Sequence, residues 1–390
     1  MVNTDIIKGF RDFEGPEMEK RAFIRSLVQQ TFNKYSFNEV ENPIIESEEF
    51  VRGENTNDES VSDIFKLTDK GKRKLALRYE LTFQLKRIAK GKKLPFRRFQ
   101  IGPVFRDEPV SGNRFRQFTQ CDVDIVGSTI KNEAEMLAIT KEILSTLKIK
   151  SIIYVNNRKL LNEILSDLEI VRKEEVIREI DKMDKLPIEE IKKNLKKLNA
   201  ERVLEIILQD EDFFEKYQGY QEIKELKKYC KYYGVEVKFS PFLARGLSYY
   251  TGSIFEIKSV IKETICAGGT YEINGNTSTG ISLGLERLQM VTKIKVEKEK
   301  ILIVSLNEDK KSIDLSRKLR QMGKSATVYF GKPSKAMEYA NSYSISKVVF
   351  VGAEEVKKKK FKVKDMDTGK EKILVLEKRT KKNVIVKKKK

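Results

Sequence analysis

The sequence predicts an α+β protein in three parts, and three patterns along the chain support this fold class. Strand-like runs joined by a glycine-containing loop between residues 75 and 127 indicate an antiparallel sheet. A later stretch is almost continuously helical in pattern and rich in Glu and Lys. Beyond it, strand-like and helix-like segments alternate, as in an α/β domain. We expect a sheet domain over 1–156 and 234–295, a helical insertion domain over 157–233, and an α/β domain with a basic tail over 299–390.

The first elements are expected to be a helix and an edge strand. Residues 16–35 form an amphipathic pattern, with apolar side chains such as Ile24 and Val28 at helical spacing. The segment SFNEVENPIIES (36–47) predicts a strand that ends near Pro43. Proline cannot donate to a sheet ladder, so this strand should lie at an edge.

The remaining elements follow from the same two periodicities. Strands are expected at LALRYEL, RRFQIGPVFRDE, RQFTQCDVDIVG, SIIYVNN, VEVKFS, SYYTGSIFEI and ETICAGG. A helix is expected over 130–148 and another within GISLGLERLQMV. In the last part, ILIVSL, SATVYF and KVVFVG predict strands separated by helices, and a hairpin should close around Thr368-Gly369.

Composition restricts the class of protein. The chain has 390 residues and a formal charge of +20, which fits either a polyanionic partner such as nucleic acid or a lysine-rich surface that maintains solubility. Its three cysteines are far apart and form no CxxC pair, so we expect neither a disulfide framework nor a metal site, and a reducing cytoplasm. The first residues contain no apolar signal-peptide core, and no apolar run is long enough to predict a membrane span.

The sequence contains no histidine. This excludes Ser-His and Cys-His nucleophile pairs, a histidine general base and histidine-ligated zinc. Phosphoryl and nucleotidyl transfer remain open, because they depend mainly on positioning and on cations that neutralise developing charge.

Two clusters have side chains suited to binding a charged ligand. In RYELT (78–82), strand alternation would place Glu80 and Thr82 on one face, where the carboxylate could hold an ammonium group; a surface charge is the simpler alternative. In FRDEPVSGNRFRQF (105–118), the loop PVSGN (109–113) is flanked by arginines and interleaved with Phe115 and Phe118. Arginine binds phosphate through a rigid fork and an aromatic ring can stack on a base, so this cluster favours nucleotide binding over a basic surface strand.

Two further clusters are weaker signals by themselves. LARGLSYYTGSIFEI (243–257) contains Arg245 and adjacent tyrosines, one of which could face a pocket and the other the core. STGISLGLERL (278–288) leads from a glycine-containing strand into a helix that carries Arg287. It matches neither a P-loop nor a dinucleotide-binding fingerprint.

Taken in order, these segments resemble the three motifs of class II aminoacyl-tRNA synthetases. The strand ending at Pro43 resembles motif 1, FRDE with RFRQF resembles motif 2, and GISLGLERL resembles motif 3. RYELT, LARGLSYYTG and AGG (267–269) resemble signatures of histidyl-tRNA synthetases, nearest to the archaeal-like branch. The resemblance covers essentially the whole chain. It implies a class II antiparallel-sheet catalytic domain, an anticodon-binding C-terminal domain, a homodimer built on motif 1 and the partner tRNA(His).

The resemblance also implies residue roles. The ATP-binding residues would be Arg106, Glu108, Arg114, Phe118 and Arg287, with Mg²⁺ bound to the nucleotide. The histidine-binding residues would be Glu80, Thr82, Gln120, Asp124, Tyr249 and Tyr250. Arg245 and Arg106 would be the catalytic cations. Three positions depart from the family pattern: Asp124 where many members have Glu, Ser248 where Asp is frequent, and Thr270 where Arg is frequent.

Three alternatives remain. A non-catalytic paralogue resembling the regulatory subunit of ATP phosphoribosyltransferase would share the catalytic core, but the complete arginine set and the C-terminal domain argue against it. A synthetase for another amino acid is disfavoured by the YYTG segment and Asp124, and a plain RNA-binding protein leaves RYELT unexplained. The absence of histidine suggests a hypothesis in which this chain is still made during histidine shortage; a biased composition explains the same observation equally well.

Overall fold

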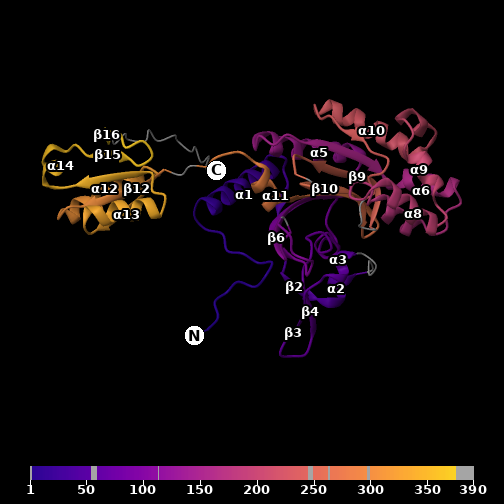
Figure 1. Cartoon of the computed structure of the whole chain (residues 1–390), viewed down its shortest axis with the longest axis horizontal. Coiled ribbons are helices and arrows are strands. Elements are labelled where there is room, and N and C mark those ends of the chain that lie inside the picture. Colours follow the sequence, from indigo (N-terminus) through magenta and orange to yellow (C-terminus); the bar gives the residue numbers. More distant parts are fainter. Residues whose placement is uncertain are drawn as a thin grey trace, which may run out of the picture. The chain divides into compact units, whose positions relative to one another are not determined.

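The computed structural model describes residues 2–53, 59–112, 114–244, 249–261, 264–296 and 299–374. Two compact units result: residues 1–12 with 21–294, and residues 13–20 with 295–390. Each contains its own sheet, as Figure 1 shows. The α+β class expected from the sequence is confirmed. None of the helices in the described part of the chain is both long and apolar enough to cross a membrane.

An eight-stranded sheet organises the larger unit. Its order is β1-β5-β6-β11-β10-β9-β7-β8, and its four central strands pair antiparallel. The strands are β1 (Asn38–Glu39), β5 (Phe96–Phe105), β6 (Gln117–Val126), β7 (Ile152–Asn157), β8 (Lys238–Phe239), β9 (Tyr250–Lys258), β10 (Cys266–Ile273) and β11 (Asn276–Gly284). The β5–β6 hairpin confirms the expected one, with Phe105 opposite Gln117 at the end next to its loop.

Helices cover one face of this sheet and build the main core. The helices are α1 (Gly15–Lys34), α5 (Ile130–Thr146), α10 (Gln218–Tyr232) and α11 (Leu285–Val291). Figure 1 shows α5 and α10 on the same side of β9 and β10. Phe32, Met136 and Ile223 pack there against alternate strand residues such as Val123 and Ile281. Because strand side chains alternate, the residues between them face away from these helices, and that opposite face contains the candidate site.

The strand expected to end near Pro43 is present at a sheet edge, as predicted, but it is only two residues long. The chain divides at Pro43 into β1, at the edge of the large sheet, and β2 (Ile45–Ser47), which belongs to a separate three-stranded sheet of order β2-β4-β3. The other elements nearby are α2 (Glu48–Arg52), α3 (Glu59–Ser62), β3 (Lys66–Thr68), β4 (Lys74–Leu77) and α4 (Leu85–Ile88). Proline lacks the N–H that one continuous ladder would require.

Residues 158–232 are helical, as expected. The elements are α6 (Arg158–Asp167), α7 (Lys173–Ile180), α8 (Ile188–Lys197), α9 (Arg202–Ile207), a 3-10 helix η1 (Glu211–Lys216) and α10. Residues of α7, α8 and α9, such as Val176, Ile191 and Val203, form a second apolar cluster with one face of α6. By contrast, Phe214 and Ile223 belong to the main core. The insertion bounds 157–233 stay a prediction, because α10 packs as part of the helical layer.

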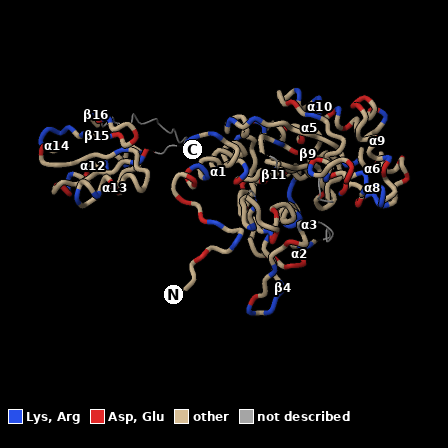
Figure 2. The backbone as a smooth tube through the Cα atoms, in the orientation of Figure 1, with Lys and Arg blue, Asp and Glu red and all other residues tan. Residues whose placement is uncertain are grey.

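The smaller unit has the alternating pattern that the sequence predicted. Its sheet order is β13-β12-β14-β15-β16, with parallel pairing among the first three strands and antiparallel pairing beyond. The elements are β12 (Lys300–Ser305), α12 (Asp309–Gln321), β13 (Ser325–Phe330), α13 (Pro333–Ser342), β14 (Lys347–Val351), α14 (Ala353–Lys358), β15 (Lys362–Asp365) and β16 (Glu371–Ile373). Figure 2 shows Lys and Arg along both units. The tail beyond residue 374 lies outside the described residues.

Candidate active site

The arginine cluster of the β5–β6 hairpin opens onto the uncovered face of the sheet. The Arg106 Nε donates to the Tyr79 carbonyl oxygen at 3.1 Å, and its guanidinium carbon lies 5.2 Å from the centre of the Phe118 ring. One guanidinium nitrogen of Arg106 is 3.5 Å from a carboxylate oxygen of Glu108. Arg114 is exposed. Among the described residues, these contacts leave most of the guanidinium donors of Arg106 without a protein partner.

Two adjoining cavities bring these arginines together with Arg287. A cavity of about 160 Å³ is lined by residues of the hairpin, β10 and α11 (Arg106, Glu108, Arg114, Phe115, Phe118, Gln120, Thr264, Ile265, Cys266, Ala267, Ser282, Gly284, Glu286 and Arg287). A second, of about 730 Å³, shares Arg106, Arg114, Arg287 and Thr264 with the first. It extends to Asp184 in the loop after α7. All five sequence-predicted ATP residues therefore surround one space.

The turn from β11 into α11 is tied to the hairpin. The carboxylate of Glu286 accepts hydrogen bonds from the Thr119 backbone N–H at 3.0 and 3.1 Å, and lies 2.8 Å from an Arg21 nitrogen. Arg287, one residue later, donates to the Thr264 carbonyl oxygen. These bonds orient Arg287 toward the cavities. Glu286 and Arg21 were not among the predicted site residues, because only the fold brings α1 beside α11.

Glu80 is not on a strand, which corrects the expectation for RYELT. Strand β4 ends at Leu77, and residues 78–84 form an irregular segment before α4. The Glu80 carboxylate accepts the backbone N–H of Phe83 at 3.1 Å, and that local bond turns the chain. Glu80 and Thr82 still line the same cavity, of about 580 Å³. Burial raises the pKa of Glu80 to about 7, although nearby Arg106 opposes the shift.

Two adjacent tyrosine rings lie near Glu80, and one of them covers a glycine of the sheet. A Cβ on Gly269 would lie 2.6 Å from the Tyr250 ring, so the ring occupies the space where a side chain would be. The ring centres of Tyr249 and Tyr250 are 4.7 Å apart, and the Tyr249 hydroxyl lies 3.4 Å from a Glu80 oxygen. Tyr249 lines the 580 Å³ cavity, whereas Tyr250 is buried in the packing beneath it. The two tyrosines thus face opposite sides, as expected for adjacent residues, with Tyr249 toward the cavity and Tyr250 in the packing.

Asp124 lies deeper and is paired with two protein side chains. One of its oxygens is 2.8 Å from Nη2 of Arg98, and the other accepts the Tyr271 hydroxyl. Sequence reasoning missed Arg98 and Tyr271. Arg98 stands directly opposite Asp124 in the β5–β6 register, a pairing that could have been found once the hairpin had been aligned. Tyr271 is 147 residues from Asp124, and no local pattern connects the two.

The side chains of Gln120 and Thr270 differ in whether they belong to the site: among the described residues, Gln120 lines a cavity and Thr270 does not. Gln120 lines the 160 Å³ cavity, and its side-chain oxygen has no hydrogen-bond partner among the described residues, so it can accept from a ligand. Thr270 points to the helical side of β10, where its hydroxyl donates to Glu133 at 2.5 Å. Burial raises the pKa of Glu133. Of the three departures, Thr270 is therefore outside the site, and Ser248 lies outside the described residues, as does the predicted catalytic Arg245.

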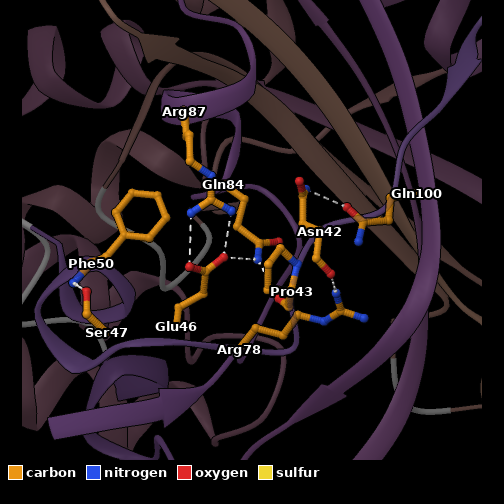
Figure 3. A network of polar contacts seen from close by, with 9 residues as sticks. All are labelled: Asn42, Pro43, Glu46, Ser47, Phe50, Arg78, Gln84, Arg87 and Gln100. Atoms are coloured by element: carbon orange, nitrogen blue, oxygen red, sulfur yellow. Dashed lines mark hydrogen bonds and ion pairs between the residues drawn. The ribbon is translucent and has the colours of Figure 1, made fainter. Parts of the chain in front are cut away.

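A polar network joins the residues around Pro43 to Arg78, Gln84 and Arg87, as Figure 3 shows. The buried Arg78 donates to the carbonyl oxygens of Pro103 and Asn42, each at 2.8 Å. The Gln84 amide donates to the Pro43 carbonyl oxygen and to Glu46, which also receives two bonds from Arg87. Residues on both sides of Pro43 are thus fixed to the segment that follows β4. Among the described residues, no group of three or more Cys, Asp or Glu side chains is arranged to hold a metal ion.

Known proteins resemble this chain over nearly its whole length. A family model described as histidyl-tRNA synthetase matches residues 9–288, and one described as an anticodon-binding domain matches residues 300–385. A "Histidine--tRNA ligase 1" of Bacillus cereus is 32% identical, over 94% of this chain and 96% of the relative. "Histidine--tRNA ligase" of Clostridium acetobutylicum is 31% identical, over 96% of this chain and 99% of the relative. Placement in an archaeal-like branch stays a prediction.

Solved structures agree in fold. Histidyl-tRNA synthetase from Nostoc sp. PCC 7120 superposes with a TM-score of 0.82 at 24% identity, covering 96% of this chain and 97% of the other. A protein from Bacillus halodurans, titled ATP phosphoribosyltransferase regulatory subunit/histidyl-tRNA synthetase, gives 0.75 at 20% identity, covering 90% and 99%. The family match covers both the cavity-bearing unit and the C-terminal unit. The chain therefore belongs to the histidyl-tRNA synthetase family, a family of ATP-dependent ligases that act on tRNA.

Proposed function

We propose that this chain activates L-histidine with ATP, giving histidyl-adenylate and pyrophosphate, and then transfers histidine to the 3′ end of tRNA(His). The single observation that carries the assignment of the ATP site is the convergence of Arg106, Arg114 and Arg287 on two adjoining cavities. Three fixed positive charges on one space suit a triphosphate, which spreads its charge over many oxygens.

Each ATP-site residue has a separate role in this proposal. Arg106 binds the α-phosphate, Arg287 the γ-phosphate side, and Glu108 and Arg114 help to bind the nucleotide. Phe118 stacks on adenine; its ring already lies under the Arg106 guanidinium. Mg²⁺ enters with ATP as part of the substrate, bridging phosphate oxygens, and Glu108 is a carboxylate on the cavity wall that can approach it.

The histidine side lies next to it. Glu80, Thr82 and Gln120 hold the α-amino group, and Asp124, Tyr249 and Tyr250 form the imidazole side. Glu80 and Thr82 line the 580 Å³ cavity with Tyr249, which supports the grouping. Burial removes water from the Glu80 carboxylate. A bound ammonium group would favour its ionised form, because an opposite charge stabilises a carboxylate.

The reaction needs no general base. The histidine carboxylate is already the nucleophile; one of its oxygens forms a bond to the α-phosphorus, and the bond from that phosphorus to the pyrophosphate oxygen breaks. Charge that develops on the nonbridging oxygens is stabilised by Arg106 and, in this proposal, by Arg245. A terminal hydroxyl of the tRNA then attacks the adenylate and releases AMP.

Assembly and location belong to the same proposal. We propose a homodimer formed around the segment of motif 1, where Ile44, Ile45 and Leu67 leave 41%, 49% and 38% of their surfaces exposed. Light scattering would test it, since Ile45→Glu should shift the mass toward the monomer. A cytoplasmic location agrees with the three buried cysteines, each of which is a free thiol.

The C-terminal unit binds tRNA, as its anticodon-binding family match implies. For tRNA(His) we propose that lysines, including those of the tail, contribute through the phosphate backbone, so affinity should fall steeply with salt. A tRNA affinity that stays constant between about 50 and about 200 mM salt would contradict this contribution.

ATP–pyrophosphate exchange with each of the twenty amino acids supplied separately tests the proposed function. Exchange with histidine alone is expected. Exchange with a different amino acid would overturn the specificity but keep the synthetase chemistry. No exchange from a folded, ATP-binding sample would support the non-catalytic paralogue.

A further inference from the structure

A row of three buried side chains runs across the sheet beneath the proposed histidine site. Arg98 on β5 is fully buried, and its Nη2 lies 2.8 Å from Asp124 on β6. The other Asp124 oxygen accepts the hydroxyl of Tyr271 on β10. One oxygen of Asp124 therefore has a protein hydrogen-bond donor, and the other is paired in charge with Arg98 without a hydrogen bond to a described residue.

Gly280 makes this row possible. It lies on β11, between β6 and β10, directly opposite Asp124. A Cβ at this position would overlap the Asp124 oxygen and lie 3.0 Å from the Tyr271 oxygen. Only a residue without a side chain lets the Tyr271 hydroxyl reach across a whole strand to Asp124.

Arg98 also connects the row to the segment that contains Glu80. The same Nη2 donates to the Leu81 carbonyl oxygen at 2.7 Å, one residue after Glu80. Nε and Nη1 of Arg98 have no hydrogen-bond partner among the described residues. Its fixed contacts are thus Asp124 and Leu81, so one buried cation holds both sides of the proposed histidine site.

The positive charge of Arg98 favours the ionised form of Asp124, and this determines which group donates in the Tyr271–Asp124 hydrogen bond. An ionised carboxylate can only accept, so Tyr271 must donate its proton to Asp124, and the phenol oxygen keeps its lone pairs for another donor. Burial raises the pKa of Asp124, and Arg98 is the charge that opposes this shift. Burial also raises the pKa of Tyr271 well above its usual value, so this hydroxyl keeps its proton.

Tyr271, and not Asp124, reaches the cavity. Tyr271 lines the 580 Å³ space together with Glu80, Thr82 and Tyr249, while Asp124 is absent from its described lining. The Tyr249 and Tyr271 rings meet edge to face, with centres 5.7 Å apart. Tyr271 is consequently a cavity-lining residue whose hydroxyl proton is already committed to Asp124.

We propose that Arg98 is a positioning residue which, through Asp124, makes Tyr271 a hydrogen-bond acceptor for the substrate's imidazole N–H. This inference rests on the proposed function and deepens it. The shorter Asp at position 124 then reads the imidazole through Tyr271 instead of touching it. Selection follows from polarity, because a ring without an N–H leaves the Tyr271 oxygen unpaired.

The first test compares two ligands in the full-length enzyme. Histidine is measured by its KM in ATP–pyrophosphate exchange, and β-(thiazol-4-yl)alanine, whose ring has a nitrogen acceptor but no N–H, by its Ki. Tyr271→Phe should raise the histidine KM roughly 10- to 100-fold and leave the thiazole Ki and the ATP KM within about twofold. Tyr229→Phe, on α10, is the matched control and should change none of them.

The second test removes the cation. Arg98→Met should lower the preference for histidine over the thiazole by about tenfold or more, because Asp124 becomes protonated and can donate to Tyr271. Arg98→Lys, which keeps the charge, should retain more of that preference. If Arg98→Met does not fold, Arg98→Met/Asp124→Asn removes both buried charges and is measured for the same ratio.

Equal losses for both ligands in Tyr271→Phe, or an unchanged preference in the Arg98 variants, would overturn the inference. Either result with normal histidine-dependent exchange in the parent leaves the proposed function standing. If the parent itself shows no histidine-dependent exchange, the proposed function fails and takes this inference with it.

Discussion

The cavity under the β5–β6 hairpin is lined by arginines that keep part of their surface in water, whereas the one beside β10 is lined by a buried carboxylate and tyrosines. Arg106 and Arg287 each donate to a backbone carbonyl oxygen of the protein. Glu80 is 6% exposed and Asp124 2% exposed, and both have raised pKa values.

The difference reflects what each side must do. A partly exposed guanidinium stays hydrated when the ligand is absent, and it can adjust its position to a flexible triphosphate. A buried carboxylate is costly unless its partners are already in place, so those partners fix one geometry and one hydrogen-bond polarity. In the proposed enzyme, binding strength for ATP comes from the open side and selectivity for histidine from the buried side.

The largest effect is expected on the open side. Arg106→Ala should lower kcat/KM for ATP–pyrophosphate exchange by about 100- to 1000-fold, because it removes a cation where charge develops. The fold should survive, since the side chain is only partly buried. Arg73→Ala is the control, because Arg73 on the β3–β4 turn is 79% exposed and pairs only with Asp69 in the described structure. A loss below about fivefold would remove Arg106 from the proposed catalytic set.

On the buried side the main effect should appear as a pH dependence. The Glu80 pKa is about 7, above its usual 4.5, so its stabilising contribution is full below pH 4.5 and is lost as pH rises through 7. The variant Glu80→Gln has no carboxyl group to ionise, so it does not lose stability in this way as pH rises. Its unfolding free energy relative to the parent should therefore rise between about pH 5 and pH 8, by up to about 3 kcal/mol.

Urea unfolding at both pH values measures that difference, and exchange assays should show a raised KM for histidine in the same variant. Parallel stability curves for parent and Glu80→Gln would mean that this carboxylate is not held in a costly ionised state. The comparison between an open and a buried side would then lose its electrostatic basis.

A smaller effect is expected for a buried polar side chain that stabilises the fold but does not face the proposed histidine site. Thr270→Val removes the hydroxyl that donates to Glu133 on the helical side of β10. We expect a loss of about 1–2 kcal/mol in unfolding free energy and no change in the KM for histidine. Thr277→Val, at an exposed position of β11, is the control. A raised histidine KM in Thr270→Val would show that the two faces are coupled.

The smallest effect is expected at the rim. Arg87 forms two bonds to Glu46, but its side chain is 45% exposed. Arg87→Ala should cost less than about 1 kcal/mol, and the cost should shrink in high salt. Unfolding in low and high sodium chloride measures this, with the neighbouring exposed Lys90→Ala as control. A larger loss of unfolding free energy that is independent of salt would mean that the Arg87–Glu46 pair behaves as a buried ion pair.

The sequence by itself determined the local parts. Apolar spacing located α1, α5 and the alternating elements of the smaller unit, and Pro, Ser, Gly and Asn located the hairpin loop, because these signals depend on neighbours a few residues apart. The ordered motifs pointed to the family and to the ATP arginines. Strand alternation failed for Glu80, because a bond from Phe83 to its own side chain turned the chain there.

Only the tertiary structure decided which polar groups meet. The Arg98–Asp124 ion pair and the Tyr271–Asp124 hydrogen bond join residues 26 and 147 positions apart, and they depend on strand register and on the space left by Gly280. It also separated Thr270 from the site by placing it on the helical face, one residue from Tyr271. Periodicity determines which face a residue can take, but its partner on that face is determined by how distant strands align.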